Sequence, residues 1–507
     1  MAETMNVEIG KYTLESLTTG MYSEPKIVYR EYIQNSVDSL EEAVALGLIE
    51  EQGMRIDIIV DAEESRISVR DNGMGISVNK APSTLLNIGN SSKRQSNNRG
   101  FRGIGRLGGM SYCNILRFVT SALGEDKKTI IQFDCKRLHE LLVPGEYEQY
   151  NLNAVLEEIT TISVVAEKEN QHYFLVELEE VSDFSDLLDL EKVKEYICQV
   201  APVPYSKRKF YYSTDVHKYM EENGYKIEEF PLFLGFDYES LEPINKPNRH
   251  RFHADRNKRK EDEIDKINYF DVVVDGECFA HGWYAESGWL GTISESTISG
   301  IRVRKGNILI GDSRTMNLIF KESRFNGWVQ GELFIVTDKL IPNARRDDFE
   351  KNEAYFKFIE NLQDGLGADI SKLIREASGK RNDISAKVIK EVEKTISEAE
   401  HDLEEGFNSS VDKEKLVEQL IQSADKLEGI KIRDELIEKK AKLIERINDT
   451  AEQVSTSSNY KINKINSGVD RKSKKMLAII SDILSTKLSK FLVDEIIEEI
   501  VEELNGK

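Results

Sequence analysis

The sequence predicts a mixed α/β protein in three parts, and three observations lead to that prediction. Up to about residue 200, amphipathic helix patterns mix with the period-two patterns of strands. The next region holds all three tryptophans and strand-like runs such as GIRVRKGNILIG and GELFIVTD. Beyond about residue 365, glycine, proline and aromatic residues become rare, while Lys, Glu, Ile and Leu recur at helical spacing. We therefore expect α/β domains at 1–200 and 201–365 and a helical or coiled-coil region at 366–507.

The composition is that of a protein able to build hydrophobic cores. Of 507 residues, 39% are hydrophobic and 31% are charged, and the formal net charge is −21. Such a charge repels nucleic acid and anionic lipid unless a local basic patch overrides it. No stretch of about 18 uncharged apolar residues is present and the N-terminus lacks a secretory pattern, so we expect no membrane span and no export. The four cysteines form no CxxC pair, which favours reduced thiols in the cytoplasm over a structural zinc site.

The segment REYIQNSVDSLEEAVALG predicts an amphipathic helix with two distinct rows. One row is apolar and consists of Ile33, Val37, Leu40 and Val44. A second row, about 200° around the helix, consists of Glu31, Asn35, Asp38 and Glu42. We expect the apolar row to pack on a core, which leaves carboxylates and an amide in line on another face. An ordinary solvated face is the alternative interpretation of that polar row.

The alternating run Ile56, Ile58 and Val60, followed by AEES and then Ile67 and Val69, predicts a β-hairpin. Its second half, RISVRDNGMGI, predicts a strand that ends in a glycine turn. Ile67 and Val69 point to one side of the strand, and Asp71 continues the same inward parity. A buried carboxylate is costly unless it accepts hydrogen bonds, for instance from an exocyclic amine. Gly73 and Gly75 allow a tight turn and close approach of a ligand to the backbone. A plain Asp-Asn-Gly turn is the alternative.

Residues 88–113, IGNSSKRQSNNRGFRGIGRLGGMSYC, are rich in glycine, serine and asparagine, with basic residues between them. Free backbone amides and interspersed Lys and Arg side chains suit phosphate oxygens. The GxGxxG spacing is weak evidence by itself, because it does not follow the strand and turn of a dinucleotide-binding unit. The segment is better explained as a lid that closes over phosphates, with a flexible surface loop as the alternative.

Together, REYIQNSVDSL, RDNGMGI and FRGIGRLGG resemble, in order and spacing, the GHKL ATPase superfamily. That superfamily includes the ninety-kilodalton heat-shock chaperones, MORC proteins, MutL and the type II topoisomerases. The resemblance implies an α+β sandwich of the GHKL (Bergerat) type for the first domain. It also implies binding of ATP with Mg²⁺ and hydrolysis of ATP to ADP and phosphate.

The resemblance assigns a role to each matching position. Glu31 corresponds to the general base that activates the attacking water, and Asn35 to the side-chain ligand of Mg²⁺. Asp71 corresponds to the acceptor of the adenine amine, and Asp38 to a second acid near the nucleotide. The remaining nucleotide contacts that it implies are Gly73, Gly75, Ser91, Ser92, Lys93, Gly100, Gly103, Ile104 and Gly105. These assignments fit phosphoryl transfer, in which positioning, a metal ion and cationic groups supply most of the catalysis.

One position departs from the superfamily pattern. The superfamily usually has Gly-Thr at the head of a later strand, where the hydroxyl helps to hold adenine. The strand that aligns, HYFLVELEE at 172–180, begins with His172 and Tyr173 instead. The adenine end of the site is therefore predicted less completely than the phosphate end.

The segment ELFIVTDKLIPNARRDDFEKNEAYFKFIENL, at 332–362, resembles the middle domain of the heat-shock chaperones. The resemblance implies a strand, a loop and a helix, with an arginine of the loop reaching the γ-phosphate. Arg346 fits that catalytic role best, and Arg345 is the alternate. Arginine suits the role because its planar fork offers two donors to phosphate. A salt bridge at the helix start, to Asp347 or Asp348, is the competing interpretation.

The only dense basic run is KPNRHRFHADRNKRK at 246–260, followed directly by EDEID. A nucleic-acid contact is one interpretation. The neighbouring acids cancel much of the field of this run, so a solvated, partly disordered insertion is favoured. His250 and His253 have loose metal-like spacing, but no cysteine or carboxylate pattern completes a site.

Near the C-terminus, apolar residues recur in a strong helical stripe. Its members are Leu477, Ile480, Leu484, Leu488, Phe491, Leu492, Ile496, Ile500 and Leu504. A solitary helix cannot bury such a face, so it must pack within the tail or against a second chain. The resemblance favours a homodimer held by these helices, with packing inside the tail as the alternative.

These features predict a cytoplasmic, homodimeric ATPase that works as a conformational clamp. Chaperone-like or MORC-like remodelling is favoured, with a protein client or an operon partner. The alternative is a DNA-processing or prokaryotic defence ATPase subunit of MutL-like type, which the acidic charge disfavours. A histidine kinase is disfavoured because His401 lies after the nucleotide segments and only about 30 residues precede Glu31. The presence of Glu31 also disfavours a nucleotide switch without turnover.

Overall fold

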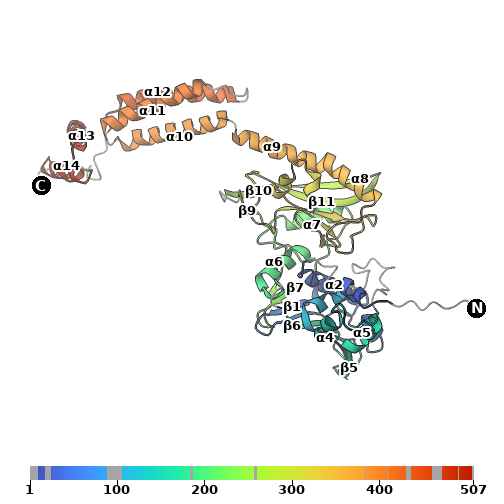
Figure 1. The fold of residues 1–507 in the computed structure, drawn as a ribbon. Coiled ribbons are helices and arrows are strands. Elements are labelled where there is room, and N and C mark those ends of the chain that lie inside the picture. The colour runs from blue at the N-terminus through green and yellow to red at the C-terminus, as the bar shows by residue number, and fades with distance from the viewer. Residues whose placement is uncertain are drawn as a thin grey trace, which may run out of the picture. The chain divides into compact units, whose positions relative to one another are not determined.

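The structure is a computed structural model that describes residues 9–17, 24–87, 105–182, 186–255, 260–382, 384–407, 409–429, 436–459, 471–488 and 490–504. The chain divides into two compact units, Met1–Ile374 and Arg375–Lys507. Figure 1 labels their helices and strands. The first unit contains two sheets with helices packed on them, and the second unit is helical. The predicted fold class is therefore confirmed.

The first sheet has eight strands in the order β5-β4-β3-β6-β2-β1-β7-β8. They are β1 (Ile56–Asp61), β2 (Arg66–Asp71), β3 (Cys113–Ser121), β4 (Lys127–Asp134), β5 (Thr160–Ala166), β6 (Tyr173–Val181), β7 (Leu232–Gly235) and β8 (Glu242–Pro243). Neighbours are antiparallel except β1 and β7, which are parallel. The predicted hairpin of β1 and β2 is confirmed. The predicted domain boundaries near 200 and 365 stay predictions, although β7 and β8 join this sheet from beyond residue 200.

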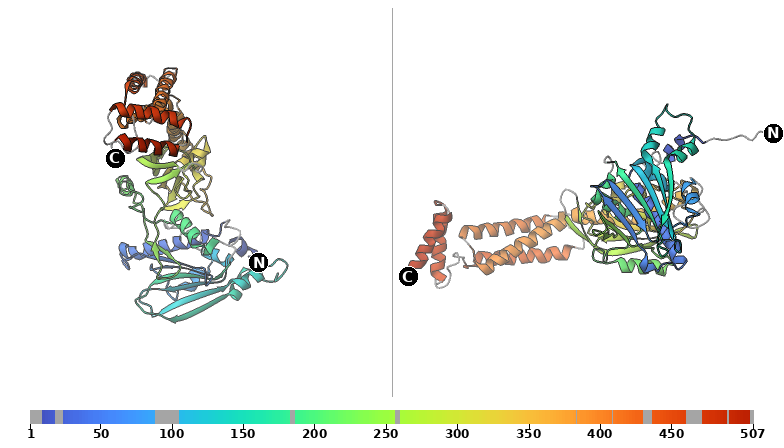
Figure 2. Two further views of the ribbon diagram at one scale, coloured as in Figure 1. Left: turned by 90° about the vertical axis from the view of Figure 1, so that its left-hand side faces the viewer. Right: turned by 90° about the horizontal axis from the view of Figure 1, so that it is seen from below.

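Several helices accompany this sheet, and α2 packs against one of its faces (Figure 2). They are α1 (Tyr12–Leu17), α2 (Ile27–Ala45), α3 (Ala81–Leu86), α4 (Cys135–Leu141), α5 (Leu152–Ile159) and α6 (Leu190–Val200), with the 3₁₀ turns η1 (Glu51–Gly53), η3 (Gly105–Ser111) and η4 (Asp186–Leu188). The predicted apolar row of α2 is buried at Ile33, Val37 and Leu40, which are at most 1% exposed. The chain leaves α2 at Gly47, whose φ of +69° suits only glycine without strain. The core of the sheet therefore fixes which face of α2 remains for polar side chains.

The second sheet has six strands in the order β13-β12-β14-β11-β10-β9. They are β9 (Arg251–Ala254), β10 (Lys260–Val274), β11 (Glu277–Ser287), β12 (Gly300–Lys305), β13 (Ile308–Ile310) and β14 (Gln330–Ile335). Neighbours are antiparallel except β12 and β14. Helix α7 (Ser213–Glu222) shares a core with Trp283 on one face, and Phe358 of α8 (Glu353–Leu362) stacks on Phe279. The strand, loop and helix predicted at 332–362 are confirmed.

The segment predicted as a solvated insertion at 246–260 is instead buried at Lys246 and Asn248 and contributes strand β9 to this second sheet. Lys246 and Asn248 are 1% and 4% exposed, and residues 251–254 form β9. Arg251 and His253 of β9 pair in register with Glu263 and Glu261 of β10. The prediction was wrong because the alternating charges were assigned to a loop, whereas they are the outward residues of two paired strands. Residues 256–259 lie outside the described part of the chain.

A buried cluster of charges lies at the centre of the second sheet. Glu332 accepts from Arg304 Nε at 2.6 Å, from Lys246 Nζ at 3.0 Å and from the Tyr205 hydroxyl. Burial alone would raise the pKa of Glu332, but Arg304 and Lys246 outweigh it and hold that pKa at about 2. Burial and the Arg304 charge lower the pKa of Lys246 to about 7. The carboxylate is therefore the group that makes two buried cations tolerable.

The second unit is built from consecutive helices. They are the end of α9 (Ala368–Asn382), then α10 (Ile384–Glu405), α11 (Ser410–Glu428), α12 (Ile437–Thr456), α13 (Arg471–Ser485) and α14 (Lys490–Leu504). Helices α10, α11 and α12 share one core, with Ile396, Leu420 and Ile447 fully buried. Helices α13 and α14 share a smaller core. Among the described helices, none is long and apolar enough to cross a membrane.

The predicted C-terminal stripe divides between the inside and the outside of the α13–α14 pair. Leu477 is buried, and Ile480, Leu484 and Ile500 are partly buried against it. On α14 the buried row is Val493, Ile497 and Val501, whereas Leu492 and Leu504 are 45% and 56% exposed. Ile496 and Ile500 of the predicted stripe lie one position before members of that buried row and are themselves partly exposed. Packing within the tail therefore accounts for only part of the apolar surface.

We predict that Glu332→Gln lowers the free energy of unfolding of this region by roughly 3–5 kcal/mol, since it leaves Arg304 and Lys246 buried without a counter-charge. Urea unfolding followed by tryptophan fluorescence measures it selectively, because the three tryptophans of the chain all lie between residues 283 and 328. The matched control is Glu261→Gln at an exposed position of strand β10, which should change stability by less than about 0.5 kcal/mol. Equal effects of the two substitutions would contradict the role given to Glu332.

Candidate active site

Helix α2 presents Glu31 to the first residue of η3. The Glu31 side chain is 15% exposed, and its Oε1 lies 3.8 Å from Nη2 of Arg30. A Cβ added to Gly105 would lie 2.0 Å from Oε2 of Glu31, so the backbone of Gly105 packs directly on the carboxylate. Only glycine permits this approach. The structure therefore brings together the polar row of α2 and the end of the glycine-rich segment.

Asn35 and Asp38 follow Glu31 along the same face of α2. Asn35 is half-buried, and its side-chain amide makes no hydrogen bond within the described part of the chain. Asp38 is buried, with 4% of its surface exposed. A partly buried amide with free capacity is unusual in a folded protein unless a ligand or water takes it up. Asn35 is thus the member of the row that remains available for a ligand.

Asp71 ends β2 as a fully buried carboxylate, as its inward parity predicted. It is 1% exposed and accepts from the backbone N of Gly73 at 2.9 Å. Burial raises its pKa from about 3.8 to about 6, although hydrogen bonds from Gly73, Ser36, Ser39 and Phe174 oppose the rise. Ser36 and Ser39 belong to α2, so this carboxylate joins the helix to the sheet.

The glycine turn after Asp71 packs tightly between α2 and β3. A Cβ on Gly73 would lie 2.2 Å from Oγ of Ser39, and one on Gly75 would lie 1.8 Å from the carbonyl oxygen of Ser121. Gly75 also has a φ of +62°, in the left-handed region. Both glycines are therefore required by close packing, and at Gly75 the backbone conformation adds a second requirement.

His172, which stands where the superfamily usually has glycine, contacts this turn. Nδ1 of His172 lies 2.7 Å from the carbonyl oxygen of Gly73. A hydroxyl is supplied nearby by Thr120 of β3, which is 1% exposed, accepts from the N of Ile76 at 2.7 Å and donates to the carbonyl of Tyr173 at 3.2 Å. Thr120 was not predicted from the sequence, because a threonine near the end of a strand carries no distinctive signal.

Six of the predicted contacts lie outside the described residues. They are Ser91, Ser92, Lys93, Gly100, Gly103 and Ile104. Their roles therefore stay predictions, and Gly105 is the one predicted contact of the lid segment that the structure describes.

Comparison with known proteins matches residues 22–165 to the family model described as histidine kinase-, DNA gyrase B-, and HSP90-like ATPase. The chain carries an ATPase domain of the GHKL superfamily. The match covers α2, the Asp71 motif and strands β1 to β4, and it stops within β5. No curated protein matches the chain. GHKL domains bind ATP, generally with Mg²⁺.

The described residues of the GHKL domain fit such a ligand. Among the described residues the amide oxygen of Asn35 has no partner, and it lies on the same row of α2 as Glu31 and Asp38. Hard oxygen ligands are those that Mg²⁺ prefers. Asp71 offers a buried acceptor, and the two tightly packed glycines keep the backbone near it free of side chains. The donor set is therefore consistent with a nucleotide and a magnesium ion.

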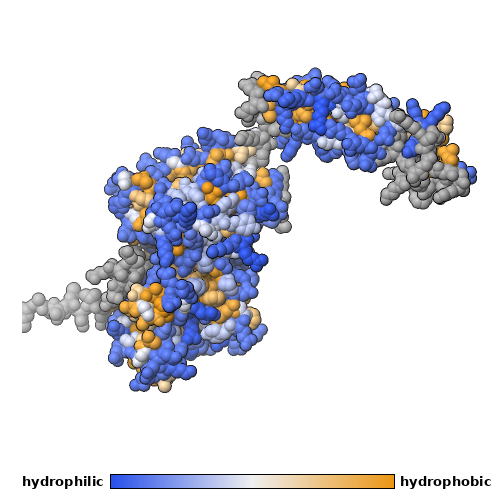
Figure 3. All heavy atoms as spheres, turned by 180° about the vertical axis from the view of Figure 1, so that it is seen from behind, coloured by the Kyte–Doolittle hydropathy of each residue, from blue (hydrophilic) through white to orange (hydrophobic). Residues whose placement is uncertain are grey.

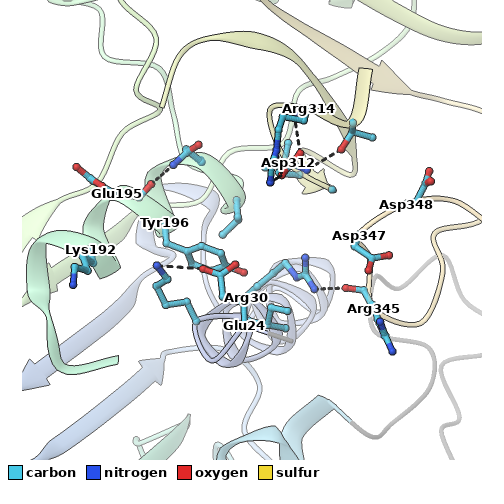
Figure 4. A pocket seen from close by; sticks show the side chains of 17 residues that line it. Glu24, Arg30, Lys192, Glu195, Tyr196, Asp312, Arg314, Arg345, Asp347 and Asp348 are labelled. Atoms are coloured by element: carbon cyan, nitrogen blue, oxygen red, sulfur yellow. Dashed lines mark hydrogen bonds and ion pairs between the residues drawn. The ribbon is translucent and has the colours of Figure 1, made fainter. Parts of the chain in front are cut away.

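A loop beyond the matched residues also contacts α2 of the GHKL domain. Nη2 of Arg30 donates to the carbonyl oxygen of Arg345 at 2.6 Å (Figure 4). The side chain of Arg345 is exposed, whereas Arg346 is 9% exposed and has a φ of +57°. Asp347 accepts from Asn343 at 2.6 Å, and Asp348 pairs with Lys351 at 2.5 Å.

A cavity of about 740 Å³ lies where this loop meets α2 and α6 (Figure 4). Arg30, Tyr196, Asp312 and Arg345 are among its lining residues. Arg345 is the single predicted site residue in that lining; Glu31, Asn35 and Asp71 are absent from it. Arg30 is 5% exposed, and its Nε has no partner within the described residues. The cavity is therefore adjacent to the nucleotide residues and separate from them.

Gln34, which lies one turn after Arg30 on α2, was also not predicted from the sequence. Gln34 is 1% exposed, and neither atom of its amide has a hydrogen-bond partner within the described residues. Sequence spacing could have placed it on the row of Arg30, but not revealed that its amide is unsatisfied.

We predict that Asp71→Asn stabilises the ligand-free protein at pH 7 by roughly 1–3 kcal/mol while weakening ATP binding. The pKa rise from about 3.8 to about 6 corresponds to about 3 kcal/mol against the ionised form at pH 7. Because the folded state holds the proton more tightly than the unfolded state, wild-type stability falls as pH rises from about 4 to about 6, and the gain appears over the same window.

Thermal unfolding of both proteins between pH 4 and pH 7.5 measures this gain, and Asp126→Asn is the control for the same substitution at an exposed position. A gain of equal size at both ends of the range would contradict the assigned pKa of Asp71.

Proposed function

We propose that the chain is an ATP-dependent conformational clamp that binds and hydrolyses ATP with Mg²⁺ and performs chaperone-like or MORC-like remodelling. The observation that carries this proposal is the hydrogen bond of 2.6 Å from Arg30 to the carbonyl of Arg345. It joins the helix of the proposed catalytic base to a loop of the second sheet. A GHKL domain that is tied to a second domain in this way can convert a change at the nucleotide into movement elsewhere.

The proposed chemistry depends on the polar face of α2. Glu31 orients a water molecule and takes its proton as that water attacks the γ-phosphate. Asn35 holds Mg²⁺, which neutralises phosphate charge when it is bound. Asp71 accepts a hydrogen bond from the adenine amine, and Gly75 lies where the backbone meets the base. The lid residues Ser91, Ser92 and Lys93 contact phosphate in this proposal.

An arginine from the loop after β14 completes the proposed site. By the resemblance Arg346 contacts the γ-phosphate, and Arg345 is the alternate. The carbonyl of Arg346 accepts from the N of Gly311 at 2.8 Å, and that of Arg345 accepts from Arg30, so the backbone of both residues is held in place. Their guanidinium groups therefore start from a fixed loop one residue apart. Such positioning reduces the entropy lost when the site closes.

The proposed homodimer forms through the exposed side of α13 and α14. Met476, Ile479 and Ile483 of α13 are 63%, 50% and 56% exposed, and Figure 3 shows apolar side chains at the surface of the helical unit. Their spacing of three and four residues makes one continuous stripe. Two short helices cannot build a stable core alone, and a second copy would complete a four-helix bundle. In this proposal the paired helices are the hinge of a cytoplasmic, homodimeric clamp. The clamp acts on a protein client or with a partner encoded in the same operon.

The alternative function is a DNA-processing or defence ATPase subunit of MutL-like type. The observation that favours it is an exposed basic turn formed by Lys207, Arg208 and Lys209. The formal net charge of −21 argues against general affinity for nucleic acid. Chaperone-like remodelling therefore remains the first proposal.

We predict that Glu31→Gln lowers kcat for Mg²⁺-dependent ATP hydrolysis by roughly 10²- to 10⁴-fold, the range for loss of a general base. The affinity for ATP should change by less than about threefold, because the substitution keeps the shape of the side chain. Phosphate release and ATP binding by calorimetry measure the two quantities.

Glu42→Gln is the matched control for this prediction, since Glu42 is exposed and belongs to the same row of α2. Turnover that survives in Glu31→Gln would contradict the role of the base. Tight ATP binding without turnover in the wild type would instead indicate a nucleotide switch.

We predict that Ile479→Glu combined with Ile483→Glu converts a dimer into a monomer, because two carboxylates cannot be buried in an apolar interface without large cost. Light scattering coupled to gel filtration gives the mass directly. Ile421→Glu is the control, because Ile421 is 52% exposed on α11 and lies outside this stripe. A wild-type protein that is monomeric at micromolar concentration would contradict the proposed hinge.

A further inference from the structure

A turn between α6 and α7 presents three consecutive basic side chains to solvent. Lys207, Arg208 and Lys209 are all exposed, and none of them forms an ion pair with a described residue. Exposed Arg251, by contrast, lies 3.1 Å from Glu263. The turn is therefore a local centre of positive charge on a protein whose formal net charge is −21.

The turn is held rigidly by the core beneath it. The N atoms of Lys209 and Phe210 both donate to the carbonyl of Ser206, at 3.0 and 2.8 Å. Phe210 is fully buried, and its ring lies 5.3 Å from that of Tyr205 and 5.1 Å from that of Trp283. The three charges are thus presented in a fixed arrangement, which lowers the entropy lost when they bind a partner.

An exposed aromatic ring lies directly beside these charges. Tyr211 is 65% exposed, and its ring centroid lies 4.9 Å from that of His250, with an angle of 36° between the planes. The N of His250 donates to the carbonyl of Lys209 at 2.6 Å, so the ring pair and the basic turn form one surface. A large exposed aromatic side chain on a rigid support is costly to hydrate and is enriched at binding surfaces.

We propose that this surface, made of Lys207, Arg208, Lys209, Tyr211 and His250, binds single-stranded nucleic acid. The three cations match successive phosphates, and the Tyr211 ring offers a platform on which a base can stack. A duplex fits less well, because its bases are already stacked and the turn is neither a helix nor a ribbon that could enter a groove. The inference is independent of ATP hydrolysis and concerns a surface outside the nucleotide residues.

Neighbouring acids limit the strength of this surface. Glu263 is half-exposed and lies 3.9 Å from Nε2 of His250, and Asp265 follows it on β10. These carboxylates repel a strand that runs across β10. The bound strand should therefore follow the turn and the Tyr211 ring, and contact with about three phosphates is expected.

The test is fluorescence anisotropy of a labelled twenty-nucleotide oligothymidylate, and of its ribonucleotide counterpart, with the full chain and no ATP. We expect micromolar binding near 50 mM salt and a slope of about −2 in the plot of log affinity against log salt, from about 0.7 per phosphate for three phosphates. Charge reversal of Lys207, Arg208 and Lys209 to Glu should weaken binding at least tenfold. Tyr211→Ala should weaken it roughly 5- to 100-fold, and Tyr211→Phe should restore it.

Two matched controls separate this surface from general exposure. Tyr238 is 57% exposed in a turn between Asp237 and Glu239, and Lys218 is exposed 3.9 Å from Glu222. Tyr238→Ala and Lys218→Glu should leave the affinity within about twofold of the wild type. Glu31→Gln should also bind the oligonucleotide normally, so a failure of this inference and a failure of the proposed ATPase are distinguishable.

Three results would overturn the inference. They are no binding at 50 mM salt, binding that the charge reversal leaves unchanged, and binding of a duplex or inorganic polyphosphate as tight as that of the oligonucleotide and insensitive to Tyr211→Ala. The last result would identify a general polyanion surface without base stacking.

Discussion

The carboxylate of Asp71 is a buried charge that the protein must solvate with its own hydrogen bonds, and much of the first half of the chain is arranged to do so. Donors come from the turn at Gly73, from Ser36 and Ser39 of α2 and from Phe174 of β6. Phe174 lies more than a hundred residues beyond the other donors in the sequence, so the sheet must form before the carboxylate is satisfied. Burial still outweighs these hydrogen bonds and raises the pKa of Asp71 to about 6. A ligand that brings a further donor would favour the ionised form of this carboxylate.

The same constraint explains why some of this arrangement could be predicted from the sequence and some could not. The apolar row of α2, the hairpin of β1 and β2 and the inward parity of Asp71 follow from local periodicity, and all were predicted. The contact of His172 with Gly73 and the hydrogen bonds of the Thr120 hydroxyl depend on how β3, β6 and the turn meet. Sequence periodicity does not encode that meeting. Likewise β7 is four residues long, and nothing in its composition indicates that it pairs in parallel with β1. Short strands are specified by their partners more than by their own residues.

Charge patterns were the least reliable guide to structure in the second sheet. The basic run at 246–260 contains Lys246, which is fully buried beside Glu332, together with Arg251 and His253, which face solvent from β9. Conversely, no function was predicted for the three basic residues at 207–209, because the run is short. A cation opposite a carboxylate creates little net field. Three cations on a turn that have no ion-pair partner among the described residues create a strong local field. A count of charges along the chain cannot separate these cases.

The contact between Arg30 and Arg345 gives the proposed clamp a physical basis for coupling. Arg30 is nearly buried and has two kinds of acceptor within reach, the carboxylate of Glu31 at 3.8 Å and the carbonyl of Arg345 at 2.6 Å. A guanidinium group has a fixed geometry, so any shift of the loop that carries Arg345 alters how Arg30 lies against Glu31. In the proposed cycle the position of the second domain thereby changes the electrostatic surroundings of the catalytic base. The adjoining cavity leaves room for such a movement, because side chains that already fill their space cannot shift without a compensating rearrangement.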